Sequence, residues 1–177
     1  MKKKMLTPVN KGLILSLILI VISVVTYVAV PDMEQQQKFG WINYIIIVGG
    51  LIWACITYSN DLNHNVTFGN LFAHGFKVTA VFTCITLVYT ILAATVIFPE
   101  MKEKAMEVAR KQMEANDDLN ESSIDQALEM TQKFFFPFLI AGVLVGSLII
   151  GAIGSLIGAA IAKKNPNPTP FESDNLS

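Results

Sequence analysis

The sequence contains few of the side chains on which catalytic, metal-binding and nucleic-acid-binding proteins rely. Its 177 residues include two cysteines and two histidines, and no cysteine has a histidine or carboxylate close by in the chain. That spacing excludes a zinc-type ligand set, and we expect Cys55 and Cys84 to be packed thiols. Thirteen basic and 14 acidic residues leave a net charge of −1, which gives no attraction to nucleic acid. We predict no catalytic, metal or cofactor-binding residue and no enzyme activity.

Charge is also missing from four long apolar runs. A helix needs about 20 residues to cross a hydrocarbon core of about 30 Å, and a backbone in lipid must satisfy its own hydrogen bonds. The uncharged runs cover residues 12–30, 41–59, 78–98 and 138–162, and with their flanks the predicted spans are about 12–30, 41–59, 71–98 and 136–162. We therefore predict an all-α, integral membrane four-helix bundle within residues 1–162. The tail 163–177 is rich in proline and polar residues and is predicted to be disordered.

Basic residues predict how the bundle is oriented. Lys2, Lys3, Lys4 and Lys11 precede the first run, and Lys38 follows it. Because basic residues are enriched on the cytoplasmic side of membrane proteins, the amino terminus is expected in the cytoplasm. The first run is too long for a signal peptide and is read as a retained anchor. Four crossings return the carboxyl terminus to the cytoplasm beside Lys163 and Lys164. Residues 99–135 then lie on the external side.

The external segment is predicted to form an antiparallel helical hairpin. Residues 101–114 are amphipathic, with apolar positions that include Met101, Met106 and Met113. This helix is expected to continue from the third span with a kink at Pro99, and Ser123 with Gln126 three residues later predicts the start of the second helix. Two interpretations stay open for the methionines: packing against the second helix, or a face for a protein partner.

Small residues recur along the fourth run at spacings that allow close helix packing. Gly142 and Gly146 are four residues apart, and so are Gly154 and Gly158, while Gly151 lies between the two pairs. These glycines are predicted to form a helix-packing face inside the bundle or, as the alternative, a homodimer face.

A few polar residues lie at the inner end of the third run. Thr67 or Asn70 is expected to cap this helix, and His74 and Lys77 follow within it, one turn apart. Together with Asp61 they are a candidate polar site at the inner mouth of the bundle. The alternative is that Lys77 extends to the headgroups and His74 lies at the interface.

Three segments resemble the domain-of-unknown-function family DUF4199. They are "KGLILSLILIVISVVTYV", "NVTFGNLFAHGFKVTAVFTCITLVYTILAATVIFPE" and the ending "IAKKNPNP". The resemblance implies a small four-span protein of the bacterial inner membrane and implies no activity, cofactor or catalytic residue.

The pattern as a whole favours a non-enzymatic structural or partner-binding module that uses its external hairpin. Its expected partners are the lipid bilayer, a periplasmic or membrane protein, and a second copy of the chain, with no nucleic acid. The alternative is a small transporter or channel, for which a homodimer is one arrangement.

Overall fold

The computed structural model describes residues 5–30, 33–115 and 120–165, and these residues contain helices and no β-strand. The helices are α1 (Pro8–Ala29), α2 (Met33–Asp61), α3 (Phe68–Leu92), the π-helix η1 (Ala93–Ile97), α4 (Met101–Glu114), α5 (Glu121–Lys133) and α6 (Phe135–Ile161). The all-α prediction is confirmed. The predicted disordered tail falls largely in residues 166–177, outside the described residues.

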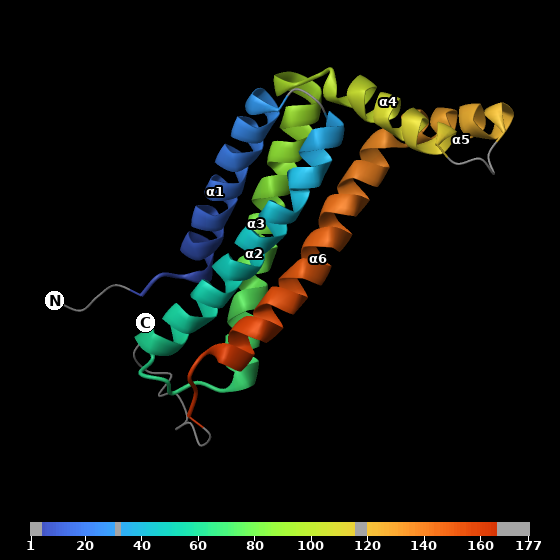
Figure 1. The fold of residues 1–177 in the computed structure, drawn as a ribbon. Helices are drawn as coiled ribbons and strands as arrows, with labels where there is room; N and C mark the ends of the chain where they lie inside the picture. Colours follow the sequence, from blue (N-terminus) through green and yellow to red (C-terminus); the bar gives the residue numbers. More distant parts are fainter. Residues whose placement is uncertain (1–4, 31–32, 116–119, 166–177) are drawn as a thin grey trace.

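Four segments are long and apolar enough to cross a membrane: Pro8–Ala29, Gly40–Asp61, Phe68–Ile97 and Phe135–Ile161. They run side by side as a bundle, while α4 and α5 extend away from it (Figure 1). Large apolar side chains cover the outside of the bundle; Leu17 is 65% exposed and Val28 is 70% exposed. In water such a surface would be unfavourable, whereas hydrocarbon is its natural solvent.

Helix α3 is the centre of the packing, because it contacts α1, α2 and α6, and α2 also packs along α6. The closest approaches are made by residues without a side chain. A Cβ on Gly154 would lie 2.8 Å from Leu51 Cδ1, and one on Gly12 would lie 2.6 Å from Val81 Cγ1. The helix backbones therefore approach each other most closely at glycines. This is expected in lipid, where burial of apolar surface does not drive helix association and close packing takes its place.

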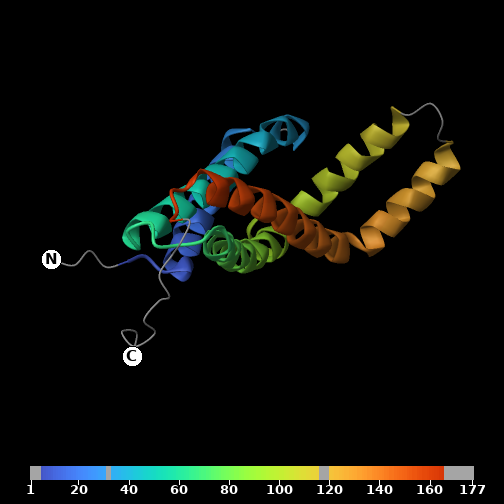
Figure 2. The same cartoon turned by 90° about the horizontal axis from the view of Figure 1, so that it is seen from below.

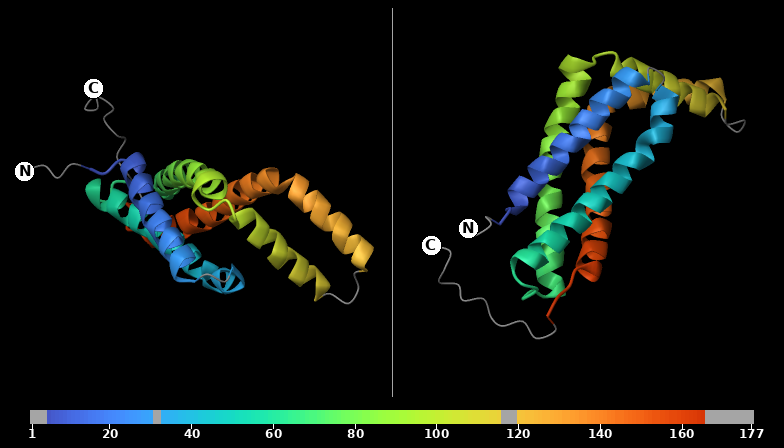
Figure 3. Two further views of the ribbon diagram at one scale, coloured as in Figure 1. Left: turned by 90° about the horizontal axis from the view of Figure 1, so that it is seen from above. Right: turned by 60° about the vertical axis from the view of Figure 1, so that its left-hand side comes forward.

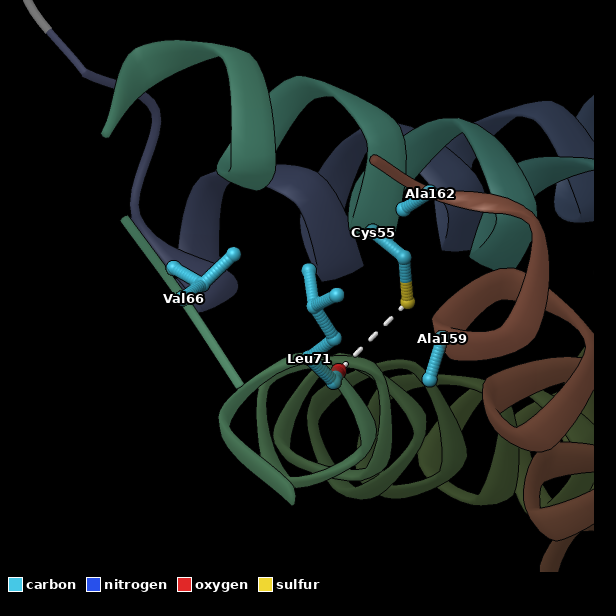
Figure 4. Close-up of a cluster of buried hydrophobic side chains, with 5 residues drawn as sticks. All are labelled: Cys55, Val66, Leu71, Ala159 and Ala162. Atoms are coloured by element: carbon cyan, nitrogen blue, oxygen red, sulfur yellow. Dashed lines mark hydrogen bonds between the residues drawn. The ribbon is translucent and has the colours of Figure 1, made fainter. Parts of the chain in front are cut away.

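A cluster of five buried residues lies at the end of the bundle where the α2–α3 loop meets the end of α6. Cys55, Leu71 and Ala159 are fully buried there, with Val66 and Ala162 beside them (Figure 4). The Cys55 thiol donates to the Leu71 carbonyl at 3.5 Å. Cys55 is thus a packed thiol, but the same expectation for Cys84 is wrong, because Cys84 is exposed on α3.

The helix predicted to continue through Pro99 does not continue. Helix α3 ends in η1, Phe98 N donates to Ala93 O at 2.8 Å, and α4 starts afresh at Met101. Proline lacks the N–H that an unbroken helix would need, and its ring disfavours helical backbone in the residue before it. Phe98 accordingly leaves the helical region at φ −135° and ψ 67°, so that α4 takes a new direction (Figure 2).

Helices α4 and α5 contact each other and project to one side of the bundle (Figure 3). We call residues 101–114 and 121–133 together the α4–α5 arm. Arg110 Nη2 reaches Asp125 Oδ1 across the two helices at 3.8 Å. Helix α5 begins at Glu121, earlier than predicted, because the Asn120 side chain accepts from Ser123 N and caps the helix in place of Ser123.

Candidate functional site

Lys11 is the most unusual residue of the bundle, because its side chain is fully buried. The Thr7 side chain accepts from Asn10 N and Pro8 occupies the first turn, so α1 begins before Lys11 rather than after it. Lys11, which precedes the first uncharged run in the sequence, is therefore part of the same helix as that run. Its charged group lies inside the end of the bundle, where an ionisable side chain is expensive and marks a candidate functional site.

Two acceptors hold the Lys11 amine. Its Nζ donates to the Ala54 carbonyl of α2 at 3.1 Å and lies 3.3 Å from His74 Nε2 of α3. When Lys11 is protonated its ammonium can only donate, so His74 Nε2 then accepts and the ring proton of a neutral His74 is on Nδ1. Three helices are thus tied together through a single cation.

An aromatic ring completes the cluster. Tyr58 of α2 stacks on His74 with ring centroids 4.0 Å apart and planes 13° apart. Lys11 Nζ lies 5.9 Å from the Tyr58 ring centroid, which is within the range of a cation–π interaction. We call Lys11, Tyr58 and His74 the inner polar cluster.

The cluster borders a cavity of about 400 Å³ that is open to the outside. The residues that line it are Pro8 of α1, Tyr58 of α2, and Asn70, Ala73, His74 and Lys77 of α3. Thr67 caps α3 by accepting from Asn70 N at 3.2 Å, which confirms one of the two predicted caps. The cap fixes the helix start, and the helix then carries His74 and Lys77 to the same cavity.

Of the three residues predicted for the inner mouth, two meet there. His74 is buried and Lys77 is exposed, and both line the cavity. Asp61 is exposed at the end of α2 and does not line it. Within the described part of the chain, no salt bridge joins Asp61 to Lys11. Sequence reasoning missed Lys11; Thr7-Pro8, a cap followed by a helix-starting proline, could have placed it within the first helix but could not identify its partners.

The amide of Asn70 and the ammonium of Lys77 give the cavity groups that can donate hydrogen bonds to an anion. In the described residues no three His, Cys, Asp or Glu side chains gather into a metal-binding group. Lysine and imidazole side chains are the donors that suit a phosphate or carboxylate group.

A second set of polar contacts joins the α4–α5 arm to the bundle. Tyr27 of α1 donates to Glu100 Oε1 at 2.6 Å, Lys104 Nζ donates to the Tyr27 hydroxyl at 3.3 Å, and the Tyr27 ring stacks on Phe98 at 3.9 Å. The hydrogen bond from Tyr27 stabilises the carboxylate and lowers the pKa of Glu100. We call Tyr27, Phe98, Glu100 and Lys104 the arm joint.

The predicted partner residues on the arm are partly covered. Met101, Met106 and Met113 are half-buried, whereas the exposed methionine of the arm is Met130, at 62%. Met106 lines a groove between α4 and α5 together with Leu128 and six polar or charged residues: Lys102, Glu103, Arg110, Asp125, Glu129 and Gln132. This surface, which we call the arm groove, has an apolar floor and walls of both charges.

The five glycines of α6 divide into two groups. Cβ atoms on Gly154 and Gly158 would press on α2, and one on Gly151 would collide with Thr79 of α3. Cβ atoms on Gly142 and Gly146 would meet nothing within 4 Å. The structure therefore places close packing at one end of α6 and open space at the other.

The family model described as "Protein of unknown function (DUF4199)" matches residues 10–164. No curated protein and no solved structure matches the chain.

Proposed function

The chain belongs to the DUF4199 family, whose description assigns no activity. From its geometry, we propose that it is a non-enzymatic, multi-pass membrane module. In this proposal it binds a protein partner through the α4–α5 arm. In this proposal the bundle lies in a bacterial inner membrane with both termini in the cytoplasm. The arm is an external antiparallel hairpin, and its partner is a periplasmic or membrane protein.

One observation carries the proposal: the arm leaves the bundle at a fixed place instead of folding back on it. Its contacts with the bundle are few, and the arm joint anchors its first turn (Figure 1). Helices that add little to the packing of the bundle are available for contacts elsewhere. Stacking of Tyr27 on Phe98 and the hydrogen bonds from Tyr27 and Lys104 hold the base of the arm in one direction, which reduces the entropy that a partner must remove on binding.

The arm groove specifies the chemistry of the partner. Met106 and Leu128 offer a soft apolar floor, and the surrounding acidic and basic side chains suit a segment with an apolar residue between charges of both signs. A catalytic role is not proposed, because the described residues of the groove include no nucleophile beside a base.

Site-specific photocrosslinking in native membranes tests this function. A photoreactive side chain at Glu129, in the groove, is expected to give a discrete adduct, and one at the outward-facing Val145 of α6 is not. Met106→Gln should remove the adduct because it places a polar group on the floor, while Met130→Gln, outside the groove, should preserve it. Equal adducts in both variants, or none at Glu129, would refute the proposal.

A second candidate is a small ion or solute transporter, and the buried Lys11–His74 pair favours it. Titratable groups within a bundle are typical of coupled transport. Liposomes containing the protein should then show a flux that Lys11→Met abolishes and Lys77→Met reduces less. Absence of flux across a panel of ions and small solutes would dismiss this candidate.

A further inference from the structure

A cavity of about 540 Å³ lies among α1, α2, α3 and α6, separate from both the inner polar cluster and the arm groove. Small-molecule sites in proteins occupy about 300–1,000 Å³, so this space has the size of a ligand pocket. Its walls are mainly apolar, with Leu19, Phe82 and Val143 among them, and none of the described residues that line it is charged. An inference from this cavity does not depend on the proposed partner of the arm.

The two glycines of α6 that have no neighbour near their Cβ position form one wall of the cavity. Gly142 and Gly146 both line it, and each has room for a side chain that the sequence does not supply. Tyr44 of α2 and Phe138 of α6 also line it and are 55% and 59% exposed, so the cavity opens to the side of the bundle there. A molecule dissolved in the bilayer can reach it without passing through water.

The hydrogen-bonding groups of the cavity favour a ligand that donates. The Thr86 and Thr90 hydroxyls donate to Phe82 O and Thr86 O in their own helix, each at 2.8 Å. The Tyr89 hydroxyl is directed at Ser23 Oγ at 3.5 Å. Asn43 Oδ1 is an acceptor that is buried without a partner in the described structure, and Asn43 lines both this cavity and a smaller one of about 170 Å³ between α1 and α2. A buried carbonyl oxygen without a partner is less favourable than a paired one.

Asn43 also lies where the head of an amphiphile belongs. The apolar segment of α2 begins at Gly40, so Asn43 is within one turn of its arm-side end. The rest of the cavity extends along the bundle from there, past Phe82 to Ile150 of α6. Its polar acceptor is thus near the membrane surface, and its apolar walls are deeper.

We propose that this cavity binds an uncharged, single-chain amphiphile from the bilayer, whose hydroxyl head donates a hydrogen bond to Asn43 Oδ1 while its chain lies along Gly142 and Gly146. An uncharged head follows from the lack of charge among the described lining residues, and a donor head follows from the unpaired acceptor. The open glycines make room for the chain.

Photoaffinity labelling of the full-length protein in lipid nanodiscs tests the proposal. The probe is a long-chain primary alcohol with a diazirine in its chain, and the matched probe is its methyl ether, which cannot donate. We expect the alcohol to label α6 and α3 peptides that line the cavity about fivefold more than the ether does, the ratio for one hydrogen bond of about 1 kcal/mol. Comparing two probes on the unaltered chain requires no variant to fold.

Two pairs of variants locate the site. Gly146→Leu fills the cavity and should abolish the labelling, whereas Gly49→Leu adds the same bulk at a position with nothing within 4 Å and should not change it. Asn43→Leu should reduce labelling by the alcohol to that by the ether. Equal labelling by both probes, or labelling that survives Gly146→Leu, overturns the proposal. So does a crosslink from Gly142 or Gly146 to a second copy of the chain, which would assign the open face to a dimer.

Discussion

At the scale of single residues, Lys11 poses the main energetic question of the bundle. Its amine is removed from water and receives two acceptors and an aromatic face in return. A buried charge remains tolerable only while its partners stay in place, and removal of one partner costs more than the net value of the interaction. The stability of this end of the bundle should therefore depend on Lys11 and His74 jointly.

We predict that His74→Leu destabilises the protein by about 2 kcal/mol, the value of a hydrogen bond to a charged group. Lys11→Met in the same chain should restore most of the loss, because no buried cation is then left short of an acceptor. Thermal unfolding in detergent, with the four chains of a double-mutant cycle, measures the coupling. Lys77→Met is the matched control, since Lys77 is exposed and should change stability little. Additive effects of the two substitutions would contradict the prediction.

Single residues also mark the limit of what the sequence predicts. His74 and Lys77 could be placed at the inner mouth because they follow the Thr67 cap at helical spacing. Lys11 could not, because a lysine beside an apolar run normally extends to the headgroups. Its burial depends on the Ala54 carbonyl and His74, which come from helices 43 and 63 residues further along the chain. Periodicity within one helix contains no information about such partners.

At the scale of elements, α6 has a packed half and an open half. Gly151, Gly154 and Gly158 sit against α2 and α3, while Gly142 and Gly146 face the cavity. The G-x-x-x-G spacing is the same in both halves, so the sequence predicts small residues throughout and cannot say which of them has a neighbour. The path of α6 brings only Gly151, Gly154 and Gly158 close to α2 and α3, and that path depends on the packing of all the helices together.

A matched pair of substitutions tests this division. Gly151→Ala forces a Cβ into Thr79 and should cost about 1–3 kcal/mol, as overpacking does. Gly146→Ala meets nothing and should be neutral or slightly stabilising, because alanine favours helix over glycine. Unfolding of the two variants in detergent gives the comparison. A similar loss at both positions would show that Gly146 also packs, as in a dimer.

At the scale of the whole molecule, the two ends of the bundle differ in kind. One end combines the closest helix contacts, the buried core around Cys55 and the inner polar cluster. The other end has the uncharged cavity and the arm joint. Spans and their number follow from long uncharged runs, which is why composition predicts them. The difference between the two ends of the bundle depends on contacts between segments that are far apart in the sequence, so only the structure shows it.

The difference between the two ends of the bundle predicts how the protein is oriented in the membrane, and reporter fusions can test that orientation. Lys11, Lys163 and Lys164 lie at the packed end, and basic residues stay on the cytoplasmic side. A phosphatase that is active only outside the cytoplasm should be active when fused after Ala115 in the arm and inactive after Asn63 in the α2–α3 loop. Green fluorescent protein after Asn165 should fluoresce. The opposite pattern would place the arm in the cytoplasm, and the partner of the arm groove would then have to be sought among cytoplasmic proteins.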